Sequence, residues 1–232
     1  MIENAILDSE DQTKHSALAF LLALIDFARR IDFFNLLNLI EIEMKTVIHS
    51  PWEKVVTLIL SIAARCGSSY AINTKLRPQH LAAQAIDAAG FADQSAFSRL
   101  YQCVTSRNVA EAQAVFSLSL QEHGLACHAQ GVIIADVDST GLVVEGEHFE
   151  LAESGYFADH PNAEGFQLLL ACASHSLREI LSIFFGPGNI NPVVWFTDLV
   201  YDLAEKVGDF ERLFLRADSL FGTGKNITFL LD

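Results

Sequence analysis

The stretch Gly131-Val-Ile-Ile-Ala-Asp136-Val-Asp138-Ser-Thr140 marks the point at which the character of the chain changes. Its first part is a short, continuous apolar run between a glycine and an aspartate. Such a run is typical of a buried strand. The sequence therefore predicts a strand over 131–136, with Asp136 and Asp138 at its C-terminal end.

The residues after this stretch predict further strands and a connecting helix. Asn191-Pro192 is a helix start, and that helix is expected to extend to about Val207. The other expected strands cover 141–145, 165–171, 178–185 and 212–217, and a last helix is expected after Gly222. Strands, then a helix, then a strand indicate an α/β domain with a parallel pair in its sheet.

The residues before Gly124 have apolar side chains at the three- and four-residue spacing of helices. Ser50-Pro51 combines a capping residue with a proline at the first helical position. The expected helices are two within 13–47, then 51–66, 76–89, 93–105 and 107–122. We therefore expect two domains, an all-helical region at 1–126 and an α/β region at 127–232.

The composition excludes two broad classes of protein. The chain has 232 residues, is 51% hydrophobic and has a formal net charge of -14. It is therefore neither a disordered chain nor a generic basic nucleic-acid coat. Residues 1–50, 51–130 and 131–232 carry -4, +1 and -11. Contact with nucleic acid is expected in the near-neutral middle block.

The cysteines and the apolar segments predict a cytoplasmic protein with no membrane contact. The four cysteines have no close or regular spacing, which fits reduced thiols. The most apolar run, Ala17–Ile25, stops at Asp26, whereas a membrane span needs about 20 residues. Acidic residues near the N-terminus also argue against a secretory leader.

Two carboxylates stand at the expected ends of two strands. Asp138 follows the strand at 131–136, and Asp218 follows Leu213-Phe-Leu-Arg-Ala. In an open α/β sheet, ligands bind outside the carboxyl ends of the strands. If these strands are neighbours, the two aspartates converge and would hold Mg²⁺ or Mn²⁺. The alternative is that each aspartate simply begins a turn.

Five segments in order resemble the DDE transposases of bacterial insertion sequences, which have a ribonuclease-H-like core. The segments are Asp138-Ser-Thr-Gly-Leu, Glu145-Gly146, Gly155-Tyr156, Phe185-Gly-Pro-Gly-Asn189 and Leu215-Arg-Ala-Asp218-Ser-Leu-Phe221. Leu76-Arg-Pro-Gln-His80 and Asp93-Gln-Ser-Ala-Phe-Ser-Arg99 look like the N-terminal part of the same family. The resemblance extends over about 50–232 and makes 127–232 a partial ribonuclease-H-like domain with a mixed sheet.

The resemblance implies a metal-dependent DNA transposase that cleaves double-stranded DNA at element ends and joins the 3′-hydroxyl to target DNA. Asp138 and Asp218 match the family's first and second acidic positions. The third, a glutamate on a later helix, and the Tyr/Arg/Glu/Lys signature have no counterpart before Asp232. We therefore expect a truncated or incomplete transposase, a homodimer when intact, whose 232 residues alone show no strand transfer.

A second interpretation starts from Asp136-Val-Asp138-Ser-Thr140, which also resembles the D-x-D-x-T motif of haloacid-dehalogenase-like phosphatases. Asp136 would then be the nucleophile and Asp138 the general acid and base. Those enzymes also need a later lysine and a metal-binding acidic loop, and neither pattern follows Thr140.

A third interpretation is a non-catalytic remnant that binds DNA through 51–130. Two short helices joined by a turn at Gly90 fit a helix-turn-helix, in which the second helix reads DNA. The expected DNA-contacting residues are Arg77, Gln94, Ser98, Arg99 and Arg107. The alternative is an ordinary helical hairpin with a solvated polar face.

Overall fold

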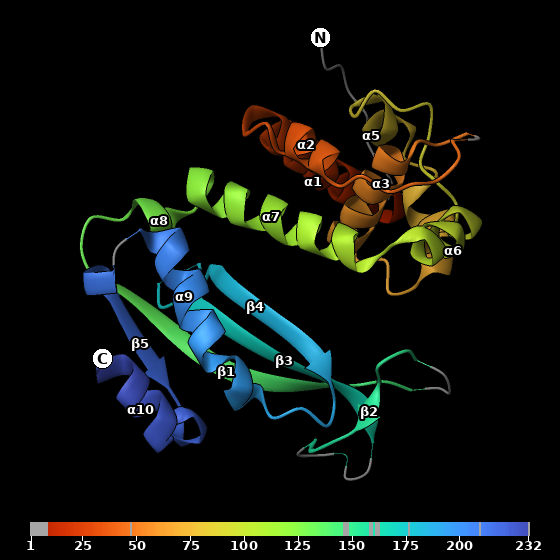
Figure 1. Ribbon diagram of the computed structural model, residues 1–232. Coiled ribbons are helices and arrows are strands. Elements are labelled where there is room, and N and C mark those ends of the chain that lie inside the picture. Colours follow the sequence, from red (N-terminus) through yellow and green to blue (C-terminus); the bar gives the residue numbers. More distant parts are fainter. Residues whose placement is uncertain are drawn as a thin grey trace. The chain divides into compact units, whose positions relative to one another are not determined.

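A computed structural model of the chain describes residues 9–46, 48–145, 149–157, 160, 163–175, 177–208 and 210–231. The motif residue Gly146 lies outside this described part. The chain divides between Ser119 and Leu120 into two compact units, which are described separately below (Figure 1). The expected boundary at 126/127 falls inside the short helix α8, Leu125–His128.

The described part of the first unit contains helices joined by irregular segments and no strand. Its helices are α1 Ser9–Arg30, α2 Phe33–Leu36, α3 Pro51–Ala63, α4 Ser69–Ala71, α5 His80–Gln84, α6 Gln94–Cys103 and α7 Ser106–His123, with a 3-10 segment at Leu37–Leu39 and a π-helical segment at Ile72–Leu76. Its core includes Ile25, Leu60, Leu76 and Phe97, all at most 2% exposed. Burying such side chains stabilises the unit by about 1.5–3 kcal/mol each.

Helix α3 begins where the sequence predicts. The Ser50 hydroxyl accepts a hydrogen bond from the Glu53 amide at 3.1 Å, and the Glu53 carboxylate accepts one from the Ser50 amide. This capping box satisfies two backbone donors that a helix start leaves free. Pro51 is the first helical residue. The start of α3 is therefore determined by four consecutive residues.

The second helix expected within 13–47 is wrong beyond Leu39. Residues 40–46 form no helix, although Ile42 is buried. The Glu41 carbonyl accepts a hydrogen bond from the Asn108 side chain at 2.9 Å, and the Glu41 amide donates one to Glu111 at 2.9 Å. These bonds to α7 replace the intrahelical bonds that the apolar spacing predicted.

The helix expected over 76–89 is also wrong in extent. Only His80–Gln84 is α-helical, and the chain then turns through Asp87, whose φ is 58°. That left-handed conformation is incompatible with a continuing helix. A helix-turn-helix of two full helices is therefore not formed by 76–105, because its first helix is a single turn.

The second unit is a mixed sheet with helices. Its elements are α8, β1 Ile133–Val143, β2 Glu153–Ser154, β3 Glu164–Ala173, β4 Ile180–Pro187, α9 Phe196–Val207, β5 Leu213–Ala217 and α10 Gly224–Leu231, with 3-10 turns at Pro192–Trp195, Phe210–Arg212 and Ser219–Phe221. Strand β3 pairs antiparallel with β1, β2 and β4, and β1 pairs parallel with β5. The expected α/β class and parallel pair are confirmed.

Strand β1 is longer than expected and unites two expected strands. It extends from Ile133 to Val143, so Asp136 and Asp138 lie within the strand and not at its end. The pairing with β3 continues without interruption from Asp138↔Leu170 to Val143↔Gly165. Residues 137–140 were expected to lie between the two strands, but each of them pairs with a residue of β3.

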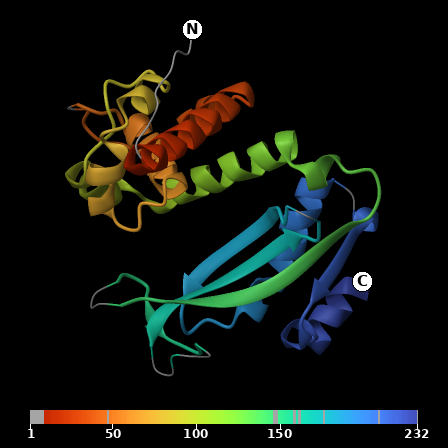
Figure 2. The same cartoon turned by 180° about the vertical axis from the view of Figure 1, so that it is seen from behind.

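Helix α9 covers one face of this sheet (Figure 1). Ala135 and Val137 of β1 are buried together with Leu199 and Leu203 of α9. Because side chains alternate along a strand, Asp136 and Asp138 lie on the opposite face. Figure 2 shows that opposite face turned toward the viewer, with α9 behind it. Among the described helices, none is long and apolar enough to cross a membrane.

Candidate functional site

Two of the predicted site residues are brought side by side by the parallel pair β1·β5. Val137 of β1 and Ala217 of β5 are register partners, and Asp138 and Asp218 are the residues that directly follow them in the chain. Strand β5 ends at Ala217, so Asp218 stands at a strand end as expected, whereas β1 continues past Asp138. The adjacency of the two strands, on which the predicted site depended, is confirmed.

Both carboxylates are exposed and have only local hydrogen bonds. Asp138 accepts a bond from the Ser139 amide at 2.8 Å. Asp218 accepts one from the Leu220 amide at 2.9 Å, which caps the following 3-10 turn. Within the described part of the chain, neither forms an ion pair with lysine or arginine. Each carboxylate therefore retains oxygens that are free to bind a cation.

Asp136 forms an ion pair, whereas Asp138, on the same face of β1, forms none with a described residue. Arg216 of β5 donates from Nε and Nη2 to the two oxygens of Asp136, at 2.6 and 2.8 Å. These bonds lower the pKa of Asp136 below its ordinary value. A carboxylate engaged at both oxygens is a poor nucleophile, which argues against the phosphatase interpretation.

A cavity of about 600 Å³ lies on this open face of the sheet. Asp136 and Asp138 line it together with Arg178 and Arg216. In the described residues, no group of three or more His, Cys, Asp or Glu side chains is close enough to hold a metal ion. A site built from Asp138 and Asp218 would thus supply two carboxylates, which is a donor set that Mg²⁺ accepts while it keeps several water ligands.

The other segments that carry the resemblance lie beside these aspartates. A pocket of about 460 Å³ is lined by Ser139 and Leu220, which follow the two aspartates, and by Gly155, Tyr156 and Gly188. A Cβ added at Gly155 would lie 1.9 Å from the Gly188 carbonyl oxygen, so the two backbones are in direct contact. Four of the five quoted segments therefore meet at one place.

The buried amide of Gln167 joins two of these segments. It donates to the carbonyl oxygens of Tyr156 at 3.2 Å and of Gly188 at 3.3 Å. Gln167 is only 7% exposed and lies on β3, between the two turns. The sequence analysis overlooked it, although a glutamine in an otherwise apolar strand is a signal that it has a specific partner.

The predicted DNA-contacting residues separate into two groups. Arg77 and Arg99 line one pocket of the helical unit. Ser98 is exposed on α6, and the backbone amide of Gln94 donates to the Asn73 side chain at 3.1 Å. Arg107, on α7, does not line that pocket.

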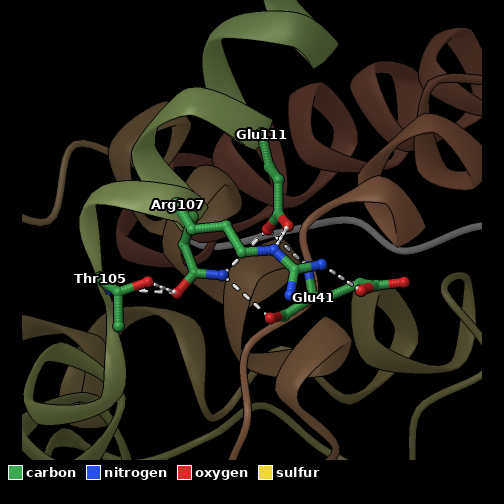
Figure 3. A network of polar contacts seen from close by, with 5 residues as sticks. Glu41, Thr105, Arg107 and Glu111 are labelled. Carbon is green, nitrogen blue, oxygen red and sulfur yellow. Dashed lines mark hydrogen bonds and ion pairs between the residues drawn. The ribbon is translucent and has the colours of Figure 1, made fainter.

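Arg107 belongs to a polar network that holds the chain before α3 against α7 (Figure 3). Its guanidinium pairs with Glu41 at 2.6 Å and with Glu111 at 2.8 Å. The two carboxylates raise the pKa of Arg107, Glu111 being the main cause. Because its charge is already neutralised, Arg107 is a weaker candidate for a phosphate contact than Arg77 or Arg99.

Lys54 is the functional candidate that the sequence analysis missed. It lies on the buried side of α3 and is 4% exposed, and it lines the pocket with Arg77 and Arg99. Lys54, Thr57 and Ser61 share one side of the helix at three- and four-residue spacing, and all three are buried. A lysine in line with Thr57 and Ser61 on one side of an otherwise apolar helix could have indicated that its side chain has a specific role.

Comparisons of this chain with family models, with curated proteins and with solved structures gave no match.

Proposed function

We propose that this chain is part of a metal-dependent DNA transposase of the DDE kind, with a partial ribonuclease-H-like second unit. The observation that carries the proposal is the position of Asp138 and Asp218, adjacent on parallel strands, exposed, and without a cationic partner among the described residues. The mixed sheet, in which α9 returns the chain to a strand parallel to β1, supports the same interpretation.

The chemistry of the pair supports a divalent cation. Two neighbouring carboxylates repel each other unless a cation lies between them, and hard oxygen ligands favour Mg²⁺ or Mn²⁺. When bound, such a cation would supply positive charge that stabilises the reacting oxygens of a phosphodiester. Asp138 and Asp218 would bind and orient it, and the pairing of β1 with β5 would set their spacing.

Asp136 has a positioning role in this proposal. Asp136 is two residues before Asp138 on β1, so its ion pair with Arg216 lies on the same face of the sheet as Asp138. The pair joins β1 to β5 and removes one negative charge from the neighbourhood of Asp138. The phosphatase alternative would need Asp136 as a free nucleophile, so the same contact favours the transposase interpretation over it.

Metal binding tests the proposal directly. Titration of the full chain with Mn²⁺, followed by electron paramagnetic resonance, should show binding that Asp138→Asn and Asp218→Asn each weaken at least about tenfold, or 1.4 kcal/mol. Asp198→Asn is the matched control, because Asp198 is exposed, lies on α9 and loses the same charge. Equal Mn²⁺ affinity in all four proteins would refute the assignment.

Activity on DNA gives a second test. With two of the three acidic residues that the resemblance requires, these 232 residues are expected to bind double-stranded DNA ends but not to join them to target DNA. Incubation with Mg²⁺ and labelled duplex, followed by gel analysis, would detect any joined product. Joined product would contradict the expectation that a third acidic group is needed.

A further inference from the structure

Basic side chains from four parts of the helical unit converge on one pocket. Its volume is about 460 Å³, which is within the range of small-molecule sites. Lys45 precedes α3, Lys54 lies on α3, Arg77 follows the π-helical segment and Arg99 lies on α6. Four positively charged groups thus face a single cavity in a chain whose formal net charge is -14.

Lys54 is buried, and no carboxylate in the described part of the chain forms an ion pair with it. It is 4% exposed, and within the described residues its ammonium group has one hydrogen-bond partner, the thioether sulfur of Met44 at 3.5 Å. Burial lowers the pKa of Lys54, and the nearby charge of Arg99 lowers it further. A buried charge is costly unless it is paired, so the structure leaves this ammonium group in need of an anion.

The other groups of the pocket do not supply that anion. Asp93 is the one carboxylate in the lining, and the Ser95 hydroxyl and the Ala96 amide both donate to its Oδ1, each at 2.8 Å. These bonds, together with the nearby charges of Arg77 and Arg99, lower the pKa of Asp93, which forms no ion pair with Lys54 among the described contacts. Among the described residues, Arg99 has one weak hydrogen bond, to Ser95 at 3.4 Å, and Arg77 forms no ion pair. Two guanidinium groups are therefore available for bidentate hydrogen bonds, the geometry that phosphate oxygens accept.

The remainder of the lining combines two polar side chains, His49 and Gln102, with less polar ones. Met44, Ile48, Ala96 and Cys103 contribute to the same cavity. The pocket is larger than an inorganic phosphate needs and offers surface to an uncharged group next to the cations. From these observations we infer that this pocket binds a phosphate ester, with its phosphate against Lys54 and Arg99 and its organic part against the apolar residues.

This inference is independent of the metal site, because the pocket lies wholly in the first unit and uses none of the sheet residues. A nucleotide in solution and a nucleotide within DNA present the same phosphate chemistry. The probes are therefore inorganic phosphate, adenosine monophosphate, adenosine and a 20-base-pair duplex, each titrated into the full chain at low ionic strength by calorimetry.

We expect adenosine monophosphate to bind, inorganic phosphate to compete with it, and adenosine not to bind. Lys54→Met and Arg99→Gln should each weaken binding at least about tenfold. Lys75→Met is the matched control, because Lys75 is exposed and does not line the pocket. Arg99 is exposed, so Arg99→Gln tests the pocket even if a change at Lys54 disturbs folding.

The duplex distinguishes the two sources of the phosphate. If the duplex binds in a manner that depends on Lys54 and Arg99, and the mononucleotide competes, the pocket receives a phosphate of DNA. If only the mononucleotide binds, the ligand is a free phosphate ester. If no probe binds, or if Lys54→Met and Arg99→Gln bind every probe as tightly as the unaltered chain, the inference is wrong, whatever the result of the Mn²⁺ titration.

Discussion

Arg216 of β5 lies directly across from Asp136 of β1 and binds both of its carboxylate oxygens. The same guanidinium reaches the Ser174 hydroxyl at 3.2 Å, so one side chain connects β5, β1 and the end of β3. Because of this contact, Asp136 differs in its charge environment from the two nearby aspartates, Asp138 and Asp218. Asp136 is neutralised by it, whereas Asp138 and Asp218 remain available to a cation.

Replacing Arg216 by glutamine should raise the pKa of Asp136 toward its ordinary value of 3.8. In the unaltered chain the folded-state pKa is lower than that of the unfolded chain, so the ion pair stabilises the fold at neutral pH. That contribution is lost as the pH falls through the folded-state pKa. The carboxyl ¹³C shift of Asp136, followed during acid titration, measures the change.

Urea unfolding gives the corresponding test of stability. The difference in unfolding free energy between the unaltered chain and Arg216→Gln should be present at pH 7 and should shrink below about pH 4. Lys225→Gln, an exposed change on α10, should show no such pH dependence. A difference that is constant with pH would show that Arg216 does not act through Asp136.

Replacing Gly155 by alanine should destabilise the second unit by about 2–3 kcal/mol, the usual cost of overpacking. The added Cβ would meet the Gly188 carbonyl oxygen at 1.9 Å, and a backbone atom cannot give way as easily as the end of a flexible side chain. Gly67→Ala is the control, because its Cβ would meet nothing within 4 Å. It should stabilise the chain slightly, by about 0.5 kcal/mol, in the same urea experiment.

Replacing Lys206 by methionine should destabilise the chain by about 3 kcal/mol. Its side chain is 4% exposed, and it donates to Asp202 at 2.6 Å and to the Leu181 carbonyl at 3.0 Å. The change would leave the Asp202 carboxylate with the Ser182 hydroxyl but without its cation. The double variant Lys206→Met/Asp202→Leu should recover part of the loss. A double variant less stable than Lys206→Met would contradict this account.

Replacing Lys54 by methionine should leave stability unchanged or raise it, by about 1 kcal/mol at pH 7, because a buried unpaired charge is removed. The pKa of Lys54 is lower in the folded chain than the ordinary 10.5, so unfolded chains bind more protons between the two values. Stability of the unaltered chain should therefore rise with pH in that interval.

The Lys54→Met variant should lack this rise. The other charged or ionisable groups that line the pocket are present in both proteins, so they do not distinguish the two curves; they are Lys45, His49, Arg77, Asp93, Arg99 and Cys103. Lys75→Met should follow the unaltered chain. If Lys54→Met keeps the full rise between neutral pH and pH 10, Lys54 is not the group responsible.

The parts of the fold that the sequence predicted are those set by nearby residues. The capping box at Ser50 and Glu53 determines where α3 begins, and the apolar run before Asp136 produces a strand. The order of strands and helix predicted that the sheet contains a parallel pair, because a crossover helix allows a parallel return. That the pair is β1 with β5, which makes Asp138 and Asp218 neighbours, was a condition of the predicted site, and the structure meets it.

The wrong predictions concern segments whose conformation depends on distant partners. Residues 40–46 have apolar spacing typical of a helix, but Asn108 and Glu111 hold Glu41 in another conformation. The Ser139-Thr140 pair is compatible with a turn or with a strand, and β3 decides in favour of the strand. Local preference is a fraction of a kcal/mol per residue, so a few tertiary hydrogen bonds override it.

The sequence by itself determined most of the succession of helices and strands, the mixed α/β class and the presence of an aspartate in or directly after each of two strands. Only the tertiary structure decided which charged side chains are paired with an opposite charge and which are not. Arg216 lies 80 residues from Asp136 and neutralises it, while Lys54 is buried and forms no ion pair with any residue that the structure describes. The physical reason is that capping and side-chain alternation act within a few residues, whereas ion pairing and burial depend on which distant segments the fold brings into contact.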